Sequence, residues 1–78
     1  MDLRYYSSAG KKTNRTVCMA ALVAGMHVSV ELATAQMQIA KEDGHYISSC
    51  KEHCAKCKML TPERAMQWVE DHLKQHHS

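Results

Sequence analysis

Large aromatic side chains are scarce in this 78-residue chain. It has no phenylalanine, one tryptophan and three tyrosines, and alanine and methionine make up much of its 45% hydrophobic content. A chain of this size forms one domain at most, and it buries about two thirds or less of the surface that its unfolded form exposes. We therefore expect a thin core that needs further stabilisation by a metal ion, disulfides or a second subunit.

Several functional motifs are also absent. The sequence contains no glycine-rich phosphate loop, no paired carboxylates spaced for acid–base catalysis and no nucleophile motif. So short a chain has little room for a substrate pocket, and we expect a binding protein rather than an enzyme. A membrane-spanning helix needs about 20 predominantly apolar residues. The apolar stretch at 16–30 is interrupted before that length, so no transmembrane span is expected.

The same stretch, residues 16–30, imitates a signal peptide. It follows a cationic segment and precedes Ala33-Thr34-Ala35, which has the form of a cleavage site. With residues 1–35 removed, a small exported metal-binding or disulfide module would begin near Gln36. His27 interrupts the apolar stretch and weakens this interpretation, so we expect a cytoplasmic protein, with a periplasmic or secreted one as the alternative.

Residues 1–12 lack sustained periodicity and predict an irregular basic lead. The net charge of the chain is only +2, but its first fifteen residues hold four cations against a single acidic residue, Asp2. Such an arm can bind phosphate, although a short basic terminus is more often simply solvated. A nucleic-acid partner would contact the following cations: Arg4, Lys11, Lys12, Arg15, Lys51, Lys56, Lys58 and Arg64.

The remaining chain, residues 13–78, predicts a single all-α domain. Apolar residues recur at spacings of three and four from about 15 to 41, which predicts one long helix, and Gly44 suits the left-handed position past its end. A second apolar stripe runs beside the first, so a homodimer that covers it is one hypothesis. Gly25 is unfavourable inside a helix by about 0.8–1 kcal/mol. Because residues near 26–32 also alternate like a strand, a β segment there is the alternative.

Two further helices complete the predicted three-helix domain. Thr13 or Asn14 can cap the first helix. The second helix is expected over 46–59. A third is expected from Pro62 to about His76. Thr61 can cap it, and proline suits the first helical position because its missing N–H is not needed there.

Cysteine and histidine gather at 45–77. Four of these residues have the spacing of zinc ligands: Cys54-x2-Cys57-x14-His72-x3-His76. Zn²⁺ takes thiolate and imidazole ligands in a tetrahedral arrangement. The pattern resembles that of the C2H2 zinc-finger family over residues 54–76, with Val69 where that family has an apolar core residue. The resemblance implies a zinc staple across the last two helices, but the family's base-contacting positions are not carried over, because the central spacer is longer.

Other uses of these residues remain open. Cys50, Cys54 and Cys57 could hold zinc or an iron–sulfur cluster with a fourth ligand. The candidates for that ligand are His45, His53, His72 and Cys18. The thiols also fall at helical spacing and would serve equally as small core side chains, or they could form disulfides.

The sequence thus predicts a small zinc-stabilised regulatory or adaptor protein, with nucleic acid as one candidate partner. A protein-binding inhibitor or antiadaptor that presents the apolar face of the long helix is the alternative. An exported metal-binding or disulfide module is a third interpretation.

Overall fold

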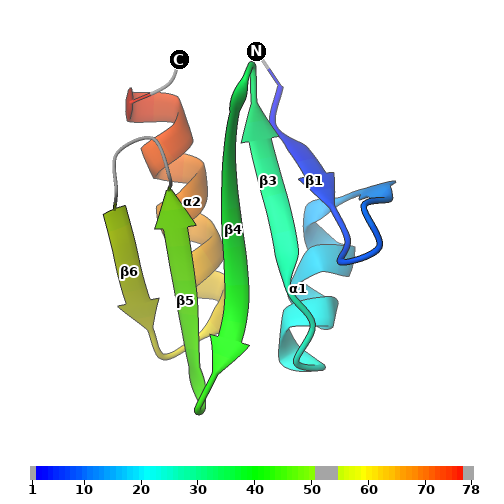
Figure 1. The fold of residues 1–78 in the computed structure, drawn as a ribbon, viewed down its shortest axis with the longest axis vertical. Helices are drawn as coiled ribbons and strands as arrows, with labels where there is room; N and C mark the ends of the chain where they lie inside the picture. The colour runs from blue at the N-terminus through cyan, green and yellow to red at the C-terminus, as the bar shows by residue number, and fades with distance from the viewer. Residues whose placement is uncertain (1, 51–54, 77–78) are drawn as a thin grey trace.

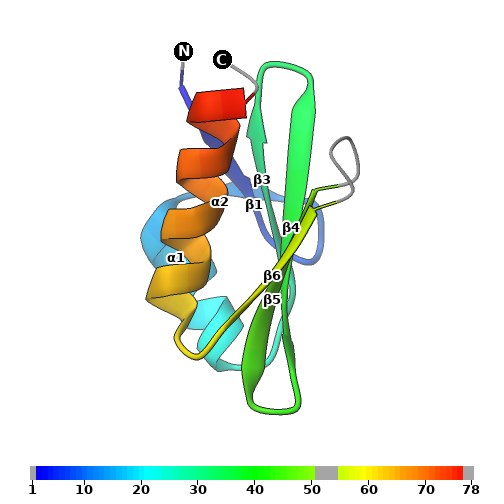
Figure 2. The same ribbon diagram turned by 90° about the vertical axis from the view of Figure 1, so that its left-hand side faces the viewer.

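The fold is one antiparallel sheet with both helices on the same face. The computed structural model describes residues 2–50 and 55–76, and its strands are ordered β2-β1-β3-β4-β5-β6. Figure 1 labels β1 and β3 to β6. The elements are β1 (Arg4–Tyr6), β2 (Lys12–Thr13), α1 (Arg15–Val23), β3 (Val28–Leu32), β4 (Ala35–Glu42), β5 (His45–Cys50), β6 (Ala55–Met59) and α2 (Pro62–His76). In Figure 2, α1 and α2 lie on one side of the sheet. No described element covers the other side.

The predicted all-α, three-helix domain is wrong, because the described chain is mainly a six-stranded sheet with two helices. The helix expected over 15–41 ends at Val23, and β3 and β4 occupy the rest of that range. The helix expected over 46–59 is replaced by most of β5 and by β6. Residues 1–12, expected to be irregular, contribute β1 and the first residue of β2.

Gly25 explains why the first helix is short. Asn14 caps its start, as expected, by accepting a hydrogen bond from the Val17 N–H at 2.9 Å. At its end, the Gly25 N–H donates to the Leu22 carbonyl at 3.0 Å and the Met26 N–H to the Ala21 carbonyl at 2.9 Å. This pair of bonds closes a helix when the residue past its end is left-handed, and Gly25 has φ 88°.

The strand predicted as the alternative for 26–32 is confirmed as β3, whereas β4 was not predicted. Alternate residues of the two strands are at most 4% exposed and face the helices: Val28, Val30, Leu32, Ala35, Met37 and Ile39. The residues between them are polar and more accessible: Ser29, Glu31, Gln36 and Gln38. One face of the sheet therefore supplies the core, and the other remains polar.

The third predicted helix is confirmed as α2. The Thr61 hydroxyl caps it by accepting from the Arg64 N–H at 3.2 Å. Ala65, Val69 and Leu73 are fully buried along one stripe, together with Met66, and α2 contacts β3 to β6. No helix among the described residues combines the length and apolar character needed to cross a membrane.

A buried carboxylate joins both helices to the first strand. Glu70 on α2 is 6% exposed; it accepts a hydrogen bond from the Tyr5 hydroxyl and pairs with the Arg15 Nε at 3.0 Å. Burial, reinforced by the hydrogen bond to Glu70, raises the pKa of Tyr5 above its usual value. This network ties β1, α1 and α2 together.

Candidate functional site

The predicted zinc ligands do not form a group within the described chain. Cys57 lies half-buried on β6, and His72 lies on α2, where its ring stacks on Trp68 with centroids 5.3 Å apart. Cys54 and the side chain of His76 lie outside the described residues. Over residues 2–50 and 55–76, no three His, Cys, Asp or Glu side chains come together as a metal-binding group, which contradicts the expected cluster for that part of the chain.

The alternative ligands are also separated. His45 and Cys50 occupy opposite ends of β5, which places them about 17 Å apart at the usual rise per residue, too far to share one ion. Cys50 is 2% exposed within the core, as the packing interpretation of the thiols predicted, although on a strand. His53 lies outside the described residues. Zinc or iron–sulfur binding through residues 51–54 stays a prediction, which native mass spectrometry with and without EDTA tests.

Two of the four cations of the expected basic arm are neutralised by ion pairs. Arg4 pairs with Glu31 at 3.3 Å, and Arg15 pairs with Glu70 at 3.0 Å. Arg4 therefore anchors β1 to β3, and Arg15 anchors α1 to α2. Their pairing reduces the cationic surface that the N-terminal segment offers to a polyanion.

The strand at the other edge of the sheet, β6, offers a different kind of surface. Within the described chain it pairs with β5 alone, with Ser48 opposite Cys57 and Tyr46 opposite Met59. Figure 1 shows no described element beyond it. An edge strand presents a row of unpaired backbone N–H and C=O groups, which another extended chain can join.

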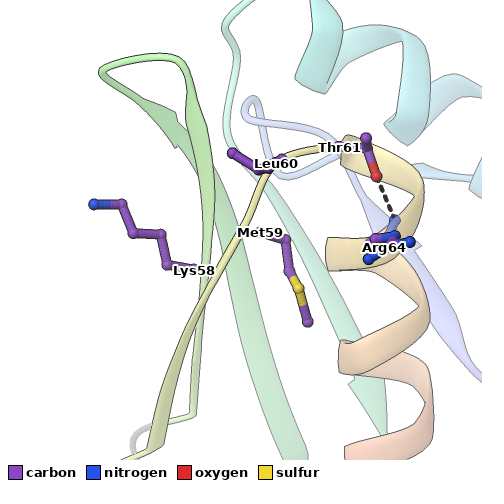
Figure 3. A pocket seen from close by; sticks show the side chains of 5 residues that line it. All are labelled: Lys58, Met59, Leu60, Thr61 and Arg64. Carbon is purple, nitrogen blue, oxygen red and sulfur yellow. Dashed lines mark hydrogen bonds between the residues drawn. The ribbon is translucent and has the colours of Figure 1, made fainter.

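Alternate side chains of β6 face different environments. Cys57 and Met59 share the helix side of the sheet with their buried partners on β5. Lys56 and Lys58 lie on the open side, and both are exposed. Figure 3 shows Lys58 directed away from α2 and Met59 directed toward it. An edge ladder is thus flanked by cations on one side and by an apolar surface on the other.

A groove follows this edge along the first turns of α2, and we call it the β6–α2 groove. Its first hollow, of about 470 Å³, is shown in Figure 3 and is lined by Lys58, Met59, Leu60, Thr61 and Arg64. A second hollow, of about 250 Å³, is lined by Met59, Arg64, Gln67, Trp68 and Asp71. The two hollows share Met59 and Arg64, so they lie next to each other between β6 and α2.

The wall that α2 contributes arises from helical periodicity. Arg64, Gln67, Trp68 and Asp71 follow one another at steps of 3, 1 and 3 residues, so they lie on one stripe. Asp71 accepts a hydrogen bond from the Gln67 amide at 3.0 Å. Arg64 has no ion pair with any other described residue, so its guanidinium is available to a carboxylate.

The sequence predicted Lys56, Lys58 and Arg64 as contacts for a nucleic-acid partner, without placing them at one edge of a sheet. Their common position depends on β6 being the last strand of the sheet, which is set by strand order. An available signal was the alternation of lysine with cysteine and methionine over Ala55–Met59, which is the pattern of an edge strand.

Comparison with known proteins found no family model, no curated protein and no solved structure that matches this chain. Inferences about function therefore rest on the geometry of the chain itself.

Proposed function

We propose that this protein is a non-enzymatic adaptor that binds an extended segment of a partner protein along β6. The observation that carries the proposal is the juxtaposition of an unpaired strand edge with the β6–α2 groove. In strand addition, backbone hydrogen bonds supply affinity and pockets for alternate side chains supply specificity. Both parts of that recognition mode lie side by side here.

Apolar groups support the same proposal. Leu60, next to the end of β6, is 74% exposed, which is high for a large aliphatic side chain. Met59 and Trp68 line the groove beyond it and remain partly accessible. A partner side chain seated between them would remove apolar surface from water, at about 25 cal/mol per Å².

The other functional hypotheses have less support. The inhibitor or antiadaptor hypothesis required a long apolar helix, and α1 ends at Val23. The nucleic-acid hypothesis loses two arginines to ion pairs. Among the described residues it retains Lys11, Lys12, Lys56, Lys58 and Arg64. Cleavage after Ala35 would remove β1, β2, α1 and β3, and intact-mass analysis of the native protein tests that version.

Amide chemical shifts provide the test, with a capped octapeptide of alternating threonine and valine as the probe. Addition of the peptide should shift the amides of β6 and of the first half of α2. The same peptide carrying N-methyl groups at alternate residues along its pairing edge should not bind, because it cannot donate to the ladder. Shifts confined to the open sheet face, or equal binding of the methylated peptide, would contradict the proposal.

A pair of exposed aliphatic residues supplies matched variants. Leu60→Ser should weaken peptide binding roughly threefold to tenfold, because it removes apolar surface beside the groove. Val23→Ser, at a residue that is 60% exposed at the end of α1, is the control and should leave binding unchanged. Trp68, the only tryptophan of the chain, reports both titrations by its fluorescence.

A further inference from the structure

We infer that the segment taken up by β6 carries acidic and apolar side chains in strict alternation. This inference rests on the proposed function and names the chemical class of its partner. The partner is an acidic extended peptide segment, rather than a second copy of this chain or a nucleic-acid strand.

The first step is the geometry of an added strand. Successive side chains of a strand point to opposite faces, and side chains directly opposite one another on paired strands have Cβ atoms about 4.5–5.5 Å apart. Residues of the partner opposite Lys56 and Lys58 would therefore lie on the open face beside two exposed ammonium groups. Residues opposite Cys57 and Met59 would face the groove. Carboxylates suit the first pair of positions, and apolar side chains suit the second.

The cations near this edge point the same way. Lys56 and Lys58 lie exposed on the open side of β6, and Arg64 lines the first hollow, where no acidic residue does. Over the described residues, Lys56, Lys58 and Arg64 have no carboxylate within ion-pair distance. A carboxylate-bearing strand would supply ion-pair partners for these three cations.

Pairing of β6 with a second copy of itself is disfavoured by the same lysines. An antiparallel pair centred on Cys57 would place Lys56 opposite the Lys58 of the other copy, and Lys58 opposite its Lys56. Four ammonium groups would then share one face, and like charges directly opposite each other destabilise a ladder. This register is thus unfavourable for a second copy and favourable for a strand of opposite charge.

The aromatic surface favours a peptide over a nucleic acid. Single-stranded nucleic acids are bound by stacking bases on aromatic rings beside a cationic track. The Trp68 ring already stacks on His72, with an interplanar angle of 27°. One face of the ring is therefore occupied, and the groove offers an apolar hollow and a backbone ladder instead.

The test compares three capped octapeptides: alternating glutamate and valine, alternating lysine and valine, and the glutamate–valine composition with all four glutamates at one end. At low salt, the alternating acidic peptide should bind at least tenfold more tightly than either of the others. The preference should shrink at 0.5 M NaCl, because exposed charge pairs are screened.

Charge reversal sharpens the test. The double variant Lys56→Glu/Lys58→Glu should lose binding to the acidic peptide and gain binding to the basic one. The control, Lys11→Glu/Lys12→Glu, changes the net charge by the same amount at the opposite edge of the sheet and should keep the original preference. Circular dichroism and thermal unfolding establish that both variants fold.

The outcomes separate the two proposals. Equal binding of acidic and basic peptides, with amide shifts on β6, would overturn the acidic preference and leave strand addition standing. Absence of binding by every peptide would overturn both. If a capped eight-residue oligothymidylate displaced the acidic peptide from β6 and bound more tightly, the lysines would be phosphate ligands and the inference would fail.

Discussion

Ala33 adopts a backbone conformation that its side chain disfavours. It lies in the two-residue turn between β3 and β4 with φ 55°, in the left-handed region where a Cβ atom costs about 1–2 kcal/mol. Ala33→Gly should therefore stabilise the fold by about 0.5–1 kcal/mol, after allowance for the greater freedom of glycine in the unfolded chain. Urea unfolding monitored by circular dichroism measures the change.

Ala24 is the matched control for that substitution. It is also an exposed alanine, but its φ of −77° is ordinary for any residue. Ala24→Gly should reduce stability by a few tenths of a kcal/mol to about 1 kcal/mol, because only the entropy cost of glycine remains. Equal effects at Ala33 and Ala24 would show that φ at Ala33 does not limit stability.

Gly44 and Gly25 show which local features of the fold could be predicted from the sequence. Gly44 was expected to be left-handed and is, with φ 78°, but together with Asp43 at φ 50° it closes the hairpin between β4 and β5. An Asp-Gly pair is a typical two-residue hairpin turn. Gly25 was treated as an unfavourable residue inside a helix, although it ends one. The conformation of these residues was partly predictable, but the elements that they join were not.

Among the elements, α2 was predictable because every local signal agrees. Thr61, Pro62 and Glu63 mark its start, and Ala65, Val69 and Leu73 share one face. Residues 28–39 fit two templates, because alanine, valine and methionine are frequent enough there to match helical spacing as well as alternation. Packing against both helices favours the strands, and that interaction is not local.

The contact between β1 and α2 makes the stability of the protein sensitive to alkaline pH. The pKa of Tyr5 is raised in the folded state. Its contribution to the free energy of unfolding is therefore complete below the ordinary tyrosine pKa of about 10, and it is lost as the pH rises above that value. Tyr5→Phe should lower the free energy of unfolding by about 1–2 kcal/mol at pH 7, because Glu70 loses a hydrogen bond. It should also make the free energy of unfolding decline less steeply above pH 10. Urea unfolding between pH 8 and 11 measures both effects.

The neighbouring tyrosine gives the comparison. Tyr6 follows Tyr5 on the opposite face of β1, away from Glu70. Tyr6→Phe should therefore keep the alkaline decline of the parent protein. A Tyr5→Phe variant that declines as steeply as the parent would show that the contact with Glu70 does not link stability to pH.

For the whole molecule, the order of strands determines which surface is available. Local sequence cannot reveal that β6 is an edge, because that depends on β3 and β4 occupying the centre of the sheet. The β6–α2 groove combines residues from β6, the following turn and α2, and so it follows from the assembled sheet. The homodimer hypothesis was based on the second apolar stripe of the long helix predicted over 15–41, and that helix is absent from the described chain. The oligomeric state stays a prediction.

The lysines of β6 lead to a prediction about assembly. Lys56→Glu alone should promote dimers, because an antiparallel pair centred on Cys57 would then place the introduced carboxylate of each copy opposite Lys58 of the other. Analytical ultracentrifugation should show a concentration-dependent mass increase relative to the parent protein. Lys56→Glu/Lys58→Glu restores like-charge repulsion and should sediment as the parent does. Equal behaviour of the single and double variants would contradict this explanation.

The position of α2 in the chain order also affects how the protein is made. Its residues Ala65, Met66, Val69 and Leu73 seal the apolar face of β3 to β6, yet α2 follows all of those strands in the sequence. On a ribosome, which adds about 5–20 residues each second, the strands emerge before their cover exists. During that interval only α1 would cover the apolar side chains of β3 and β4, among them Val28, Val30, Met37 and Ile39. A nascent chain that stalled before Pro62 would therefore be a ready substrate for chaperones and prone to aggregate.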